Sequence, residues 1–441
     1  MERYFGTDGI RGVANQDLTP ELAFRCGNAV ARLKTRPRIV IGRDTRTSGE
    51  MFLMCVCGGA MAAGGDVIDL GVIPTAGVAY MTRYLGADFG IVISASHNPD
   101  KFNGIKVFRA DGRKMSEAEE AATEQYFSAT WLVEPQLIGR RTVRLDSLKI
   151  YADSLCSTVH SGLAGFKIVL DCSNGASCIV APEVFKRLGA EVVCIGNRSE
   201  GGAINEDCGS LHPQGLQAEV LKQGADMGFA FDGDADRVIA VDENGQLGDG
   251  DQILYLLARR RKALGLLPCG CVVGTSHTNL GMEHALNRLG VKLHRADIGD
   301  KYVMELMQKT GGTLGGEQSG HVILSDYATT GDGILTALKV AEAVRETGQK
   351  LSELLKVELY PQTNVSIEVK EKLRIMGNEA LSRAVEEQRK ALEGKGRIVV
   401  RASGTEPVIR VFAECMDAGL ADRCAHEVAD CIREIDAMYE V

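Results

Sequence analysis

Gly86-Ala-Asp-Phe-Gly90 recurs in the chain as Gly224-Ala-Asp-Met-Gly228, and a short apolar run follows each copy. The first run, Ile91-Val-Ile93, leads into the loop Ser94-Ala-Ser-His97. The second run, Phe229-Ala-Phe231, leads into Asp232-Gly-Asp-Ala-Asp-Arg237. Such internal similarity indicates that one structural unit is repeated. The two polar loops are therefore predicted to occupy equivalent positions.

The segments before each copy also match. Two strand-like stretches precede each of them, with helix-like stretches between: strands at 38–41, 66–69, 167–170 and 191–194, and helices at 48–63 and 181–188. A third repeat can be drawn through Cys271-Val-Val273, Val291-Lys-Leu293 and the glycine-rich segment that ends at His321. Alternating strands and helices predict the α/β class, here three repeated α/β domains with mostly parallel sheets. Each domain would carry a loop at the carboxyl end of a strand, where open α/β sheets place their sites.

The remainder of the chain has the pattern of a small α+β domain. We expect strands at 363–369, 396–400 and 408–413, and helices at 376–392 and from about 421. The loop Arg401-Ala-Ser-Gly-Thr-Glu-Pro407 between two of these strands offers donors to an anion, or is a plain hairpin turn. The predicted domains are 1–152 with the serine loop, 153–250 with the aspartate loop, 251–361 with the glycine-rich loop, and 362–441.

Asp232, Asp234 and Asp236 are spaced two residues apart and form a set of hard oxygen ligands for Mg²⁺ or Ca²⁺. With Glu243 they also match positions of a helix-loop-helix calcium site. That interpretation fails because Arg237 stands where a sharp turn needs glycine, and because the flanking segments are strand-like. Mg²⁺ beside a phosphorylated ligand fits better, with Arg237 free to pair with phosphate oxygens.

Composition excludes several classes of protein. The chain has 441 residues, of which 45% are hydrophobic and 25% charged, and a net charge of -9 that argues against a nucleic-acid partner. The short basic run 259–262 is interpreted as a solvated helix face. Neither an export signal nor an apolar stretch long enough for a membrane span is indicated.

The 13 cysteines are odd in number and irregularly spaced, which favours a reducing cytoplasm over a disulfide framework. The pairs Cys55/Cys57 and Cys269/Cys271 lack the partners of a zinc site.

Each of the other loops permits two interpretations. Ser96 is either a turn former or a nucleophile, and His97 is either a base or a cap for the next backbone group. Glu317 and Ser319 either bind sugar hydroxyls or only satisfy their own loop. Taken together, the four loops supply a hydroxyl, a metal cage, a sugar-type acceptor and a phosphate cradle.

Five motifs resemble the signature loops of the α-D-phosphohexomutases, in order and over essentially the whole chain: Phe5-Gly-Thr-Asp-Gly-Ile-Arg-Gly12, Ser94-Ala-Ser-His-Asn-Pro99, Asp232-Gly-Asp-Ala-Asp-Arg237, Gly316-Glu-Gln-Ser-Gly-His321 and Arg401-Ala-Ser-Gly-Thr-Glu-Pro407. Within that family the opening motif, Asn103-Gly-Ile-Lys106 and Gln318 are most similar to the bacterial branch that acts on glucosamine phosphates.

The resemblance implies a phosphoserine enzyme whose four domains surround a central cleft. Ser96 would carry the phosphoryl group, and Mg²⁺ would be held by Asp232, Asp234, Asp236 and an oxygen of the phosphoserine. The enzyme would interconvert glucosamine 6-phosphate and glucosamine 1-phosphate through a 1,6-bisphosphate, which also serves as activator, and so supply amino-sugar nucleotide and cell-wall synthesis. The implied phosphate and sugar ligands are Arg237, Glu317, Ser319, Arg401, Ser403, Gly404, Thr405 and Arg410.

The general base stays open among Lys106, Arg11 and His321, and a lysine among cations is expected to have a lowered pKa. Lys301 stands where this branch usually has arginine, and the segment around His277 also departs from its pattern. Two other functions stay open: a phosphoglucomutase or phosphomannomutase with the same loops, and a sugar-phosphate sensor without turnover. A homodimer also stays open.

Overall fold

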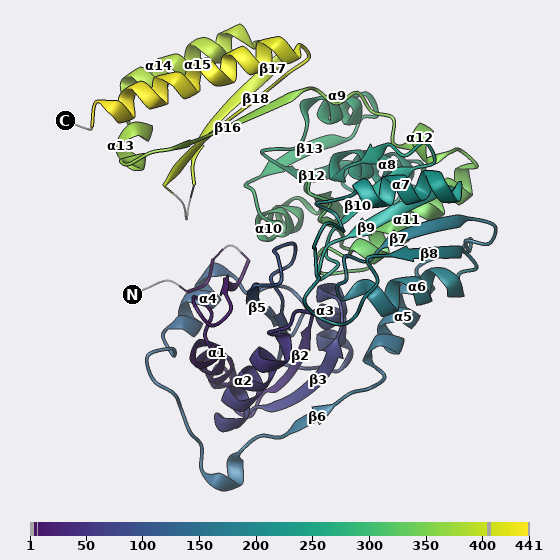
Figure 1. Cartoon of the computed structure of the whole chain (residues 1–441), viewed down its shortest axis with the longest axis vertical. Helices are drawn as coiled ribbons and strands as arrows, with labels where there is room; N and C mark the ends of the chain where they lie inside the picture. Colours follow the sequence, from purple (N-terminus) through teal and green to yellow (C-terminus); the bar gives the residue numbers. More distant parts are fainter. Residues whose placement is uncertain (1–3, 7, 404–406, 440–441) are drawn as a thin grey trace. The chain divides into compact units, whose positions relative to one another are not determined.

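A computed structural model describes residues 4–6, 8–403 and 407–439. The chain divides into two compact units (Figure 1): Met1–Thr278 with Leu286–Lys356, and Asn279–Ala285 with Val357–Val441. The first unit contains three β-sheets, and the second contains one.

The first sheet has six strands in the order β1-β5-β4-β2-β3-β6. Their bounds are β1 Ile10–Val13, β2 Arg38–Arg43, β3 Asp66–Val72, β4 Phe89–Ile93, β5 Phe102–Arg109 and β6 Arg141–Val143. Strands β4, β2, β3 and β6 run parallel, and β5 pairs antiparallel with β4 and β1. Strand β4 is buried from Gly90 to Ile93, as expected for a strand covered on both faces of a sheet.

Helices α1 (Pro20–Arg32) and α2 (Gly49–Ala62) pack against each other beside this sheet, as Figure 1 shows in purple. Glycine permits their close approach. A Cβ atom on Gly27 would lie 2.1 Å from the Val56 carbonyl oxygen, and one on Gly59 would lie 2.0 Å from that of Phe24. Leu53, Val56 and Ala60 of α2 belong to a core cluster that also includes Ile39 and Ile41 of β2. Helix α3 (Thr75–Tyr84) also contacts β2 and β4.

The second and third sheets repeat the central topology of the first. The second has the order β11-β10-β9-β7-β8, and the third β13-β12-β14-β15. Their bounds are β7 Lys167–Asp171, β8 Glu191–Ile195, β9 Met227–Phe231, β10 Val238–Asp242, β11 Leu247–Gly248, β12 Cys271–Thr275, β13 Lys292–Ala296, β14 Leu314–Gly316 and β15 Val322–Leu324. In each sheet a central strand (β2, β7 or β12) has two parallel neighbours, one of which pairs antiparallel with the next strand. The predicted repeat and the predicted α/β class are confirmed.

The helices that accompany these sheets are α4 Glu117–Glu124, the 3₁₀ helix Pro135–Leu137, α5 Ser147–Ser157, α6 Ser177–Arg187, α7 Gln214–Gln223, α8 Gly250–Ala263, α9 Leu280–Arg288, α10 Asp300–Thr310, α11 Gly333–Thr347 and α12 Leu351–Leu354. Local sequence explains several of their starts. Asp249 caps α8 and forms a capping box with Gln252. Asp332 caps α11 by accepting from the Leu335 N–H. Among the described residues, none of the helices combines the length and apolar character that crossing a bilayer requires.

The second unit contains a three-stranded antiparallel sheet in the order β16-β18-β17, packed against helices. Its elements are β16 Gln362–Glu368, α13 Lys372–Met376, α14 Glu379–Ala391, β17 Gly396–Ala402, β18 Val408–Cys415 and α15 Ala418–Ala437. The predicted α+β character is confirmed. The helix expected at 376–392 is α14, which begins at Glu379 because Asn378 caps it by accepting from the Ala380 N–H, and the short helix α13 before it was not predicted.

Candidate active site

The serine loop follows β4 at the carboxyl end of that strand. Ser96 is buried and adopts a left-handed backbone conformation, with φ of 51°, which is uncommon for a residue other than glycine. The Ser96 N–H donates to Ser94 Oγ at 2.9 Å, and Ser94 Oγ donates to Asp44 Oδ2 at 2.6 Å. These bonds hold the backbone of the loop and leave the Ser96 hydroxyl for another partner.

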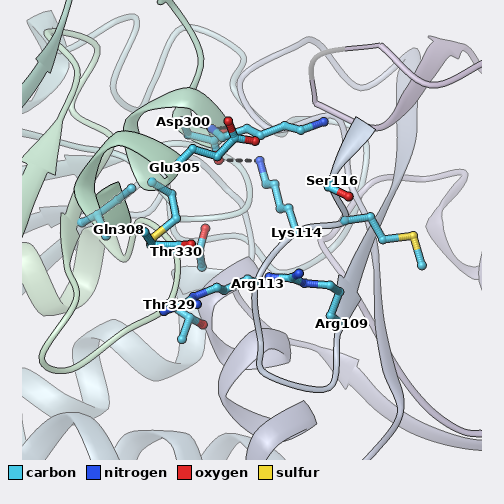
Figure 2. Close-up of a pocket in the computed structure, with 13 residues that line it drawn as sticks. Arg109, Arg113, Lys114, Ser116, Asp300, Glu305, Gln308, Thr329 and Thr330 are labelled. Carbon is cyan, nitrogen blue, oxygen red and sulfur yellow. Dashed lines mark hydrogen bonds and ion pairs between the residues drawn. The ribbon is translucent and has the colours of Figure 1, made fainter. Parts of the chain in front are cut away.

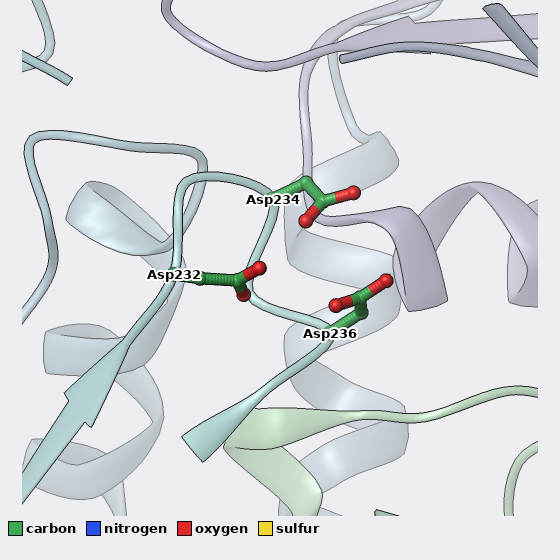
Figure 3. Close-up of side chains that lie close together, drawn as sticks. All are labelled: Asp232, Asp234 and Asp236. Atoms are coloured by element: carbon green, nitrogen blue, oxygen red, sulfur yellow. The ribbon is translucent and has the colours of Figure 1, made fainter. Parts of the chain in front are cut away.

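The aspartate loop follows β9 at the equivalent position, and Figure 3 shows its three carboxylates turned toward one another. One oxygen from each of Asp232, Asp234 and Asp236 lies within 4.8 Å of the others, and all three side chains are buried. Asp234 Oδ1 and Asp236 Oδ1 have no hydrogen-bond partner among the described residues. Buried carboxylate oxygens without partners fit a hard divalent cation. The flanking elements are strands β9 and β10, so a helix-loop-helix calcium site is excluded.

The two loops meet. Ser96 Oγ donates to Asp232 Oδ2 at 2.6 Å, across 136 residues of sequence. Glycine at position 233 permits this contact, because a Cβ atom there would lie 2.6 Å from the Ser96 carbonyl oxygen. Burial, together with the carboxylates of Asp236 and Asp234, raises the pKa of Asp232 to about 8. The Ser96 hydroxyl and the cluster of three carboxylates are therefore joined by one hydrogen bond.

Lys106 on β5 supplies positive charge to the same cluster. Its Nζ lies 2.8 Å from Asp234 Oδ2, 3.4 Å from Asp236 Oδ2 and 3.3 Å from Asp8 Oδ2. Burial acts to lower the pKa of Lys106, but these carboxylates outweigh it and the pKa is raised. The expectation of a lowered pKa for this lysine is wrong, because carboxylates rather than cations surround it. Arg11 reaches the cluster indirectly, by pairing with Asp8.

His321 also contacts the cluster, through Asp236. Its Nδ1 is 3.6 Å from Asp236 Oδ1, its Nε2 is 3.5 Å from Asp300 Oδ2, and the Gly331 N–H donates to Nε2 at 3.1 Å. Burial acts to lower the pKa of His321, but Asp236 and Asp300 outweigh it and raise the pKa. In the neutral ring the Gly331 bond occupies the lone pair of Nε2, which leaves Nδ1–H directed at Asp236.

Lys114 joins this region to the segment that follows β5. It pairs with Asp8, and its Nζ lies 2.5 Å from Asp300 Oδ2. Figure 2 shows the Lys114–Asp300 pair at the edge of a cavity of about 240 Å³. The Lys114 side chain therefore links Asp8, near the start of the chain, to Asp300, at the start of α10.

Arg237, Glu317 and His97 also gather here. The Arg237 N–H donates to Asp232 Oδ1 at 3.1 Å, and its side chain lies close enough to Glu317 for their charges to interact. The Gly299 N–H donates to Glu317 Oε1 at 3.1 Å, and burial raises the pKa of Glu317. Burial, with Arg237 and Arg11, lowers the pKa of His97 to about 4, so its ring is neutral at physiological pH. Ser319 is exposed in the turn after β14.

The predicted phosphate loop lies in the second unit. Arg401 of β17 and Arg410 of β18 stand directly opposite each other in the antiparallel register. Burial and the charge of Arg410 lower the pKa of Arg401. The Ser403 N–H donates to the Val408 carbonyl at 2.8 Å, whereas Gly404 and Thr405 lie outside the described residues. Like charges placed opposite each other are unfavourable, which fits a site for an anion.

The chain is similar to known proteins along its whole length. Family descriptions of phosphoglucomutase/phosphomannomutase match four consecutive segments: α/β/α domain I at residues 2–132, domain II at 149–245, domain III at 249–360 and the C-terminal domain at 363–431. The chain belongs to the phosphoglucomutase/phosphomannomutase family.

Curated relatives of the chain have a more specific name than that of the family. A phosphoglucosamine mutase of Brevibacillus brevis is 46% identical over 445 residues, which covers 98% of this chain and 99% of the relative. A phosphoglucosamine mutase of Moorella thermoacetica is 48% identical over 426 residues, covering 95% of this chain and 96% of the relative.

Solved structures share the fold. A phosphoglucomutase/phosphomannomutase family protein from Burkholderia thailandensis has a TM-score of 0.82 at 22% identity, over 98% of each chain. An Aspergillus fumigatus N-acetylphosphoglucosamine mutase, solved with GlcNAc-6P and magnesium, has a TM-score of 0.72 at 17% identity, over 98% of this chain and 96% of that one.

Several residues around the site were not predicted from the sequence. Thr75 Oγ1 donates to Asp234 Oδ2 at 2.6 Å, and Lys114, Asp300 and Asp8 link the cations to His321. Asp8 stands inside the opening motif Phe5–Gly12, and a carboxylate between glycines in that motif is a signal that could have found it. Lys301 pairs with Glu120 at 3.0 Å. The cysteines are all free.

Proposed function

We propose that the chain is a phosphoglucosamine mutase, which interconverts glucosamine 6-phosphate and glucosamine 1-phosphate through a phosphoserine at Ser96. The contact between Ser96 Oγ and Asp232 Oδ2, at 2.6 Å, carries the proposal, because it places a hydroxyl against a three-carboxylate cage. The whole-length relatives named phosphoglucosamine mutase support the choice of sugar.

Phosphoryl transfer depends mainly on positioning and on positive charge near the transferred group. Asp232, Asp234, Asp236 and an oxygen of the phosphoserine would hold Mg²⁺, and when bound this ion would neutralise charge on the phosphoryl oxygens. In the first step the bond between phosphorus and Ser96 Oγ breaks, and a bond forms to the 1-hydroxyl oxygen of glucosamine 6-phosphate. The proton of the sugar hydroxyl passes to a base, Ser96 Oγ takes up a proton as it leaves phosphorus, and the product is glucosamine 1,6-bisphosphate.

The second step reverses the first with the other phosphate. The bisphosphate turns over in the site, and Ser96 Oγ gives up its proton as it takes the 6-phosphoryl group. The 6-oxygen of the sugar takes up a proton as it leaves phosphorus, and glucosamine 1-phosphate is released. Free sugar 1,6-bisphosphate would charge an unphosphorylated Ser96 in the same way and so act as activator. The product would enter amino-sugar nucleotide and cell-wall precursor synthesis.

The three candidates for proton transfer differ in their surroundings. Lys106 has a raised pKa, so it suits a proton donor and a stabiliser of the phosphoryl charge. His321 has its Nε2 occupied by the Gly331 N–H, so in its neutral form it suits a positioning role at Asp236. Arg11 acts through Asp8, which also contacts Lys106. Lys106 is therefore the strongest of the three candidates for donating a proton to the leaving oxygen, but a lysine that stays protonated cannot accept the proton of the sugar hydroxyl.

Substrate binding is assigned to the remaining loops. Glu317 and Ser319 would bind sugar hydroxyls, and Arg237 would pair with phosphate oxygens beside Ser96. Arg401, Ser403, Gly404, Thr405 and Arg410 would bind the phosphate that is not reacting. The opposed guanidinium groups of Arg401 and Arg410 support this assignment. Arginine binds phosphate well because its planar fork of donors matches two oxygens.

The decisive experiment compares initial rates on glucosamine 6-phosphate, glucose 6-phosphate and mannose 6-phosphate, with Mg²⁺ and a trace of sugar bisphosphate. We expect kcat/KM to be highest for glucosamine 6-phosphate and Ser96→Ala to be inactive. Ser128→Ala, at an exposed position, is the matched control and should keep wild-type rates. A preference for glucose or mannose phosphate would leave the proposed mechanism unchanged but would show that the assigned substrate is wrong. Binding without turnover, unaffected by Ser96→Ala, would show a sensor instead.

A further inference from the structure

Arg46 lies beneath the serine loop, in the turn after β2, and is 1% exposed. Its guanidinium has five N–H groups, and all of them find acceptors. Nε donates to Asp44 Oδ2 at 2.9 Å, Nη1 to the carbonyls of Pro99 at 2.5 Å and Phe102 at 2.9 Å, and Nη2 to those of Ser96 at 2.8 Å and Asn98 at 2.7 Å. One buried side chain thus binds three carbonyls of the loop that carries Ser96 and a fourth at the start of β5.

These bonds close into a ring around Ser96. Arg46 Nη2 binds the Ser96 carbonyl, and Arg46 Nε binds Asp44 Oδ2. Asp44 Oδ2 accepts from Ser94 Oγ at 2.6 Å, and Ser94 Oγ accepts from the Ser96 N–H at 2.9 Å. Both the N–H and the C=O of Ser96 are therefore fixed by a network that ends on one guanidinium.

A second group binds the same carbonyls from the repeat that carries the aspartate loop. Asn205 Nδ2 donates to the Ser96 carbonyl at 2.9 Å and to the Asn98 carbonyl at 3.0 Å. The Ser96 carbonyl is thereby turned toward Arg46, Asn205 and Gly233, while Ser96 Oγ faces Asp232. Without these donors, a serine with φ of 51° would lose the bonds that stabilise its strained backbone.

We propose that Arg46 is a positioning residue for the transfer step, which holds the Ser96 backbone so that Oγ is aimed at Asp232 and the metal cage. The inference rests on the proposed function, since it assigns Arg46 a part in the same reaction. Within the described part of the chain, the Arg46 side chain donates to Asp44 and to backbone carbonyls rather than to Ser96 Oγ or the aspartate loop, so it acts on Ser96 through the backbone. Lysine cannot replace it, because a single ammonium nitrogen lacks the planar fork that reaches four carbonyls and Asp44.

The test compares Arg46→Lys, Arg46→Ala and Asn205→Ala with Arg43→Ala. Arg43 is the matched control, a neighbouring arginine that binds the Asp44 carbonyl and Glu50 rather than the serine loop. For Arg46→Lys we expect kcat to fall by about 100-fold with KM nearly unchanged, because a small misplacement of the reacting oxygen is enough to cause such a loss. Asn205→Ala should lose about tenfold in kcat, and Arg43→Ala should keep wild-type kcat.

Chemical rescue separates positioning from stability. Methylguanidinium added to folded Arg46→Ala should restore part of kcat, and should not affect Arg43→Ala. Wild-type kcat in folded Arg46→Lys, or a loss that matches the unfolded fraction measured by circular dichroism, would overturn the proposal. If neither Arg46 variant folds, Asn205→Ala decides, because its loop position is half-buried, and unchanged kcat there would also overturn it.

All rates are measured on the hexose phosphate that the wild-type enzyme turns over fastest, so an error in the assigned sugar does not affect the outcome. A wild-type protein that turns over none of the three phosphates would contradict the proposed function instead. In that case, phosphorylation of Ser96 by glucose 1,6-bisphosphate, followed by intact mass, still reports on the loop. Equal rates of phosphorylation in wild type and Arg46→Lys would then overturn the positioning role.

Discussion

Ser96 Oγ and Asp232 Oδ2 are 2.6 Å apart, although 136 residues separate them in the sequence. The hydrogen bond links the loops of two repeats, and Gly233 lets their backbones approach. Asp232 is at the same time the carboxylate whose pKa burial and its two neighbours raise to about 8. Asp232, which accepts from the Ser96 hydroxyl, is therefore also the group that would have to lose a proton before it could bind a cation.

Cation binding should consequently be linked to proton release. A carboxyl group with a pKa of about 8 is largely protonated at neutral pH, and a metal ligand must be deprotonated. As pH falls below about 8, the apparent affinity for Mg²⁺ should weaken by up to about tenfold per pH unit. Isothermal titration calorimetry in two buffers of different ionisation enthalpy measures the protons released. Asp232→Asn should bind Mg²⁺ more weakly and without this pH dependence. Binding that releases no proton at neutral pH would contradict the shared role of Asp232.

Asp234→Asn should reduce turnover strongly. The substitution removes a ligand charge from the cage and weakens the bonds from Thr75 and Lys106 to Asp234 Oδ2. We expect kcat to fall by about 10²–10³-fold, the range seen when one charge-stabilising group is lost from an active site. Asp226→Asn, at an exposed carboxylate just before β9, is the control and should be unaffected. Near-normal rates in Asp234→Asn would remove the metal assignment.

Lys106→Met should affect both activity and stability. The lysine neutralises Asp234 and Asp236, and without it these buried carboxylates would lack their nearest cation, whereas Asp8 would keep Arg11 and Lys114. Breaking a buried ion pair by removing one partner costs about 3–5 kcal/mol, so urea unfolding should show a large loss. Turnover should fall by about 10²-fold or more. Lys101→Met, at an exposed position nearby, controls for the loss of a lysine. A variant with wild-type stability would show that the cluster does not depend on Lys106.

The positions of the loops could be predicted from the sequence because the repeat fixes them. Gly86 and Gly224 each begin a segment that leads through a strand to a loop, and sheets with parallel strands place such loops at one edge. The cluster of Asp232, Asp234 and Asp236 could likewise be predicted from their spacing, since alternate positions of one loop can bring three carboxylates to one point. These features depend on residues that are close in the sequence.

The residues missed in the sequence depend on contacts between distant segments. Thr75 meets Asp234 across 159 residues, and Lys114 meets Asp300 across 186. Neither residue belongs to a motif with a chemical meaning of its own. The pKa of Lys106 was predicted in the wrong direction for the same reason, because its neighbours along the chain are not the carboxylates that surround it in space. Local spacing gives no information on such pairs.

Asp332→Asn should stabilise the protein at neutral pH but not in acid. Asp332 is buried, accepts from the Tyr151 hydroxyl at 2.7 Å and caps α11, and burial raises its pKa from the ordinary 3.8 to about 6. The folded state therefore holds the proton more tightly than the unfolded state, so stability decreases as pH rises between these two values and stays lower above about 6.

Asparagine keeps an oxygen for the cap and can donate to the tyrosine, but carries no charge. We expect a gain of about 1–3 kcal/mol near pH 7 and almost none near pH 4, measured by urea unfolding at both pH values. Tyr151→Phe, which removes the hydroxyl but keeps the carboxyl group, should be destabilised at both. An equal gain for Asp332→Asn at the two pH values would show that the buried charge of Asp332 is not its cause.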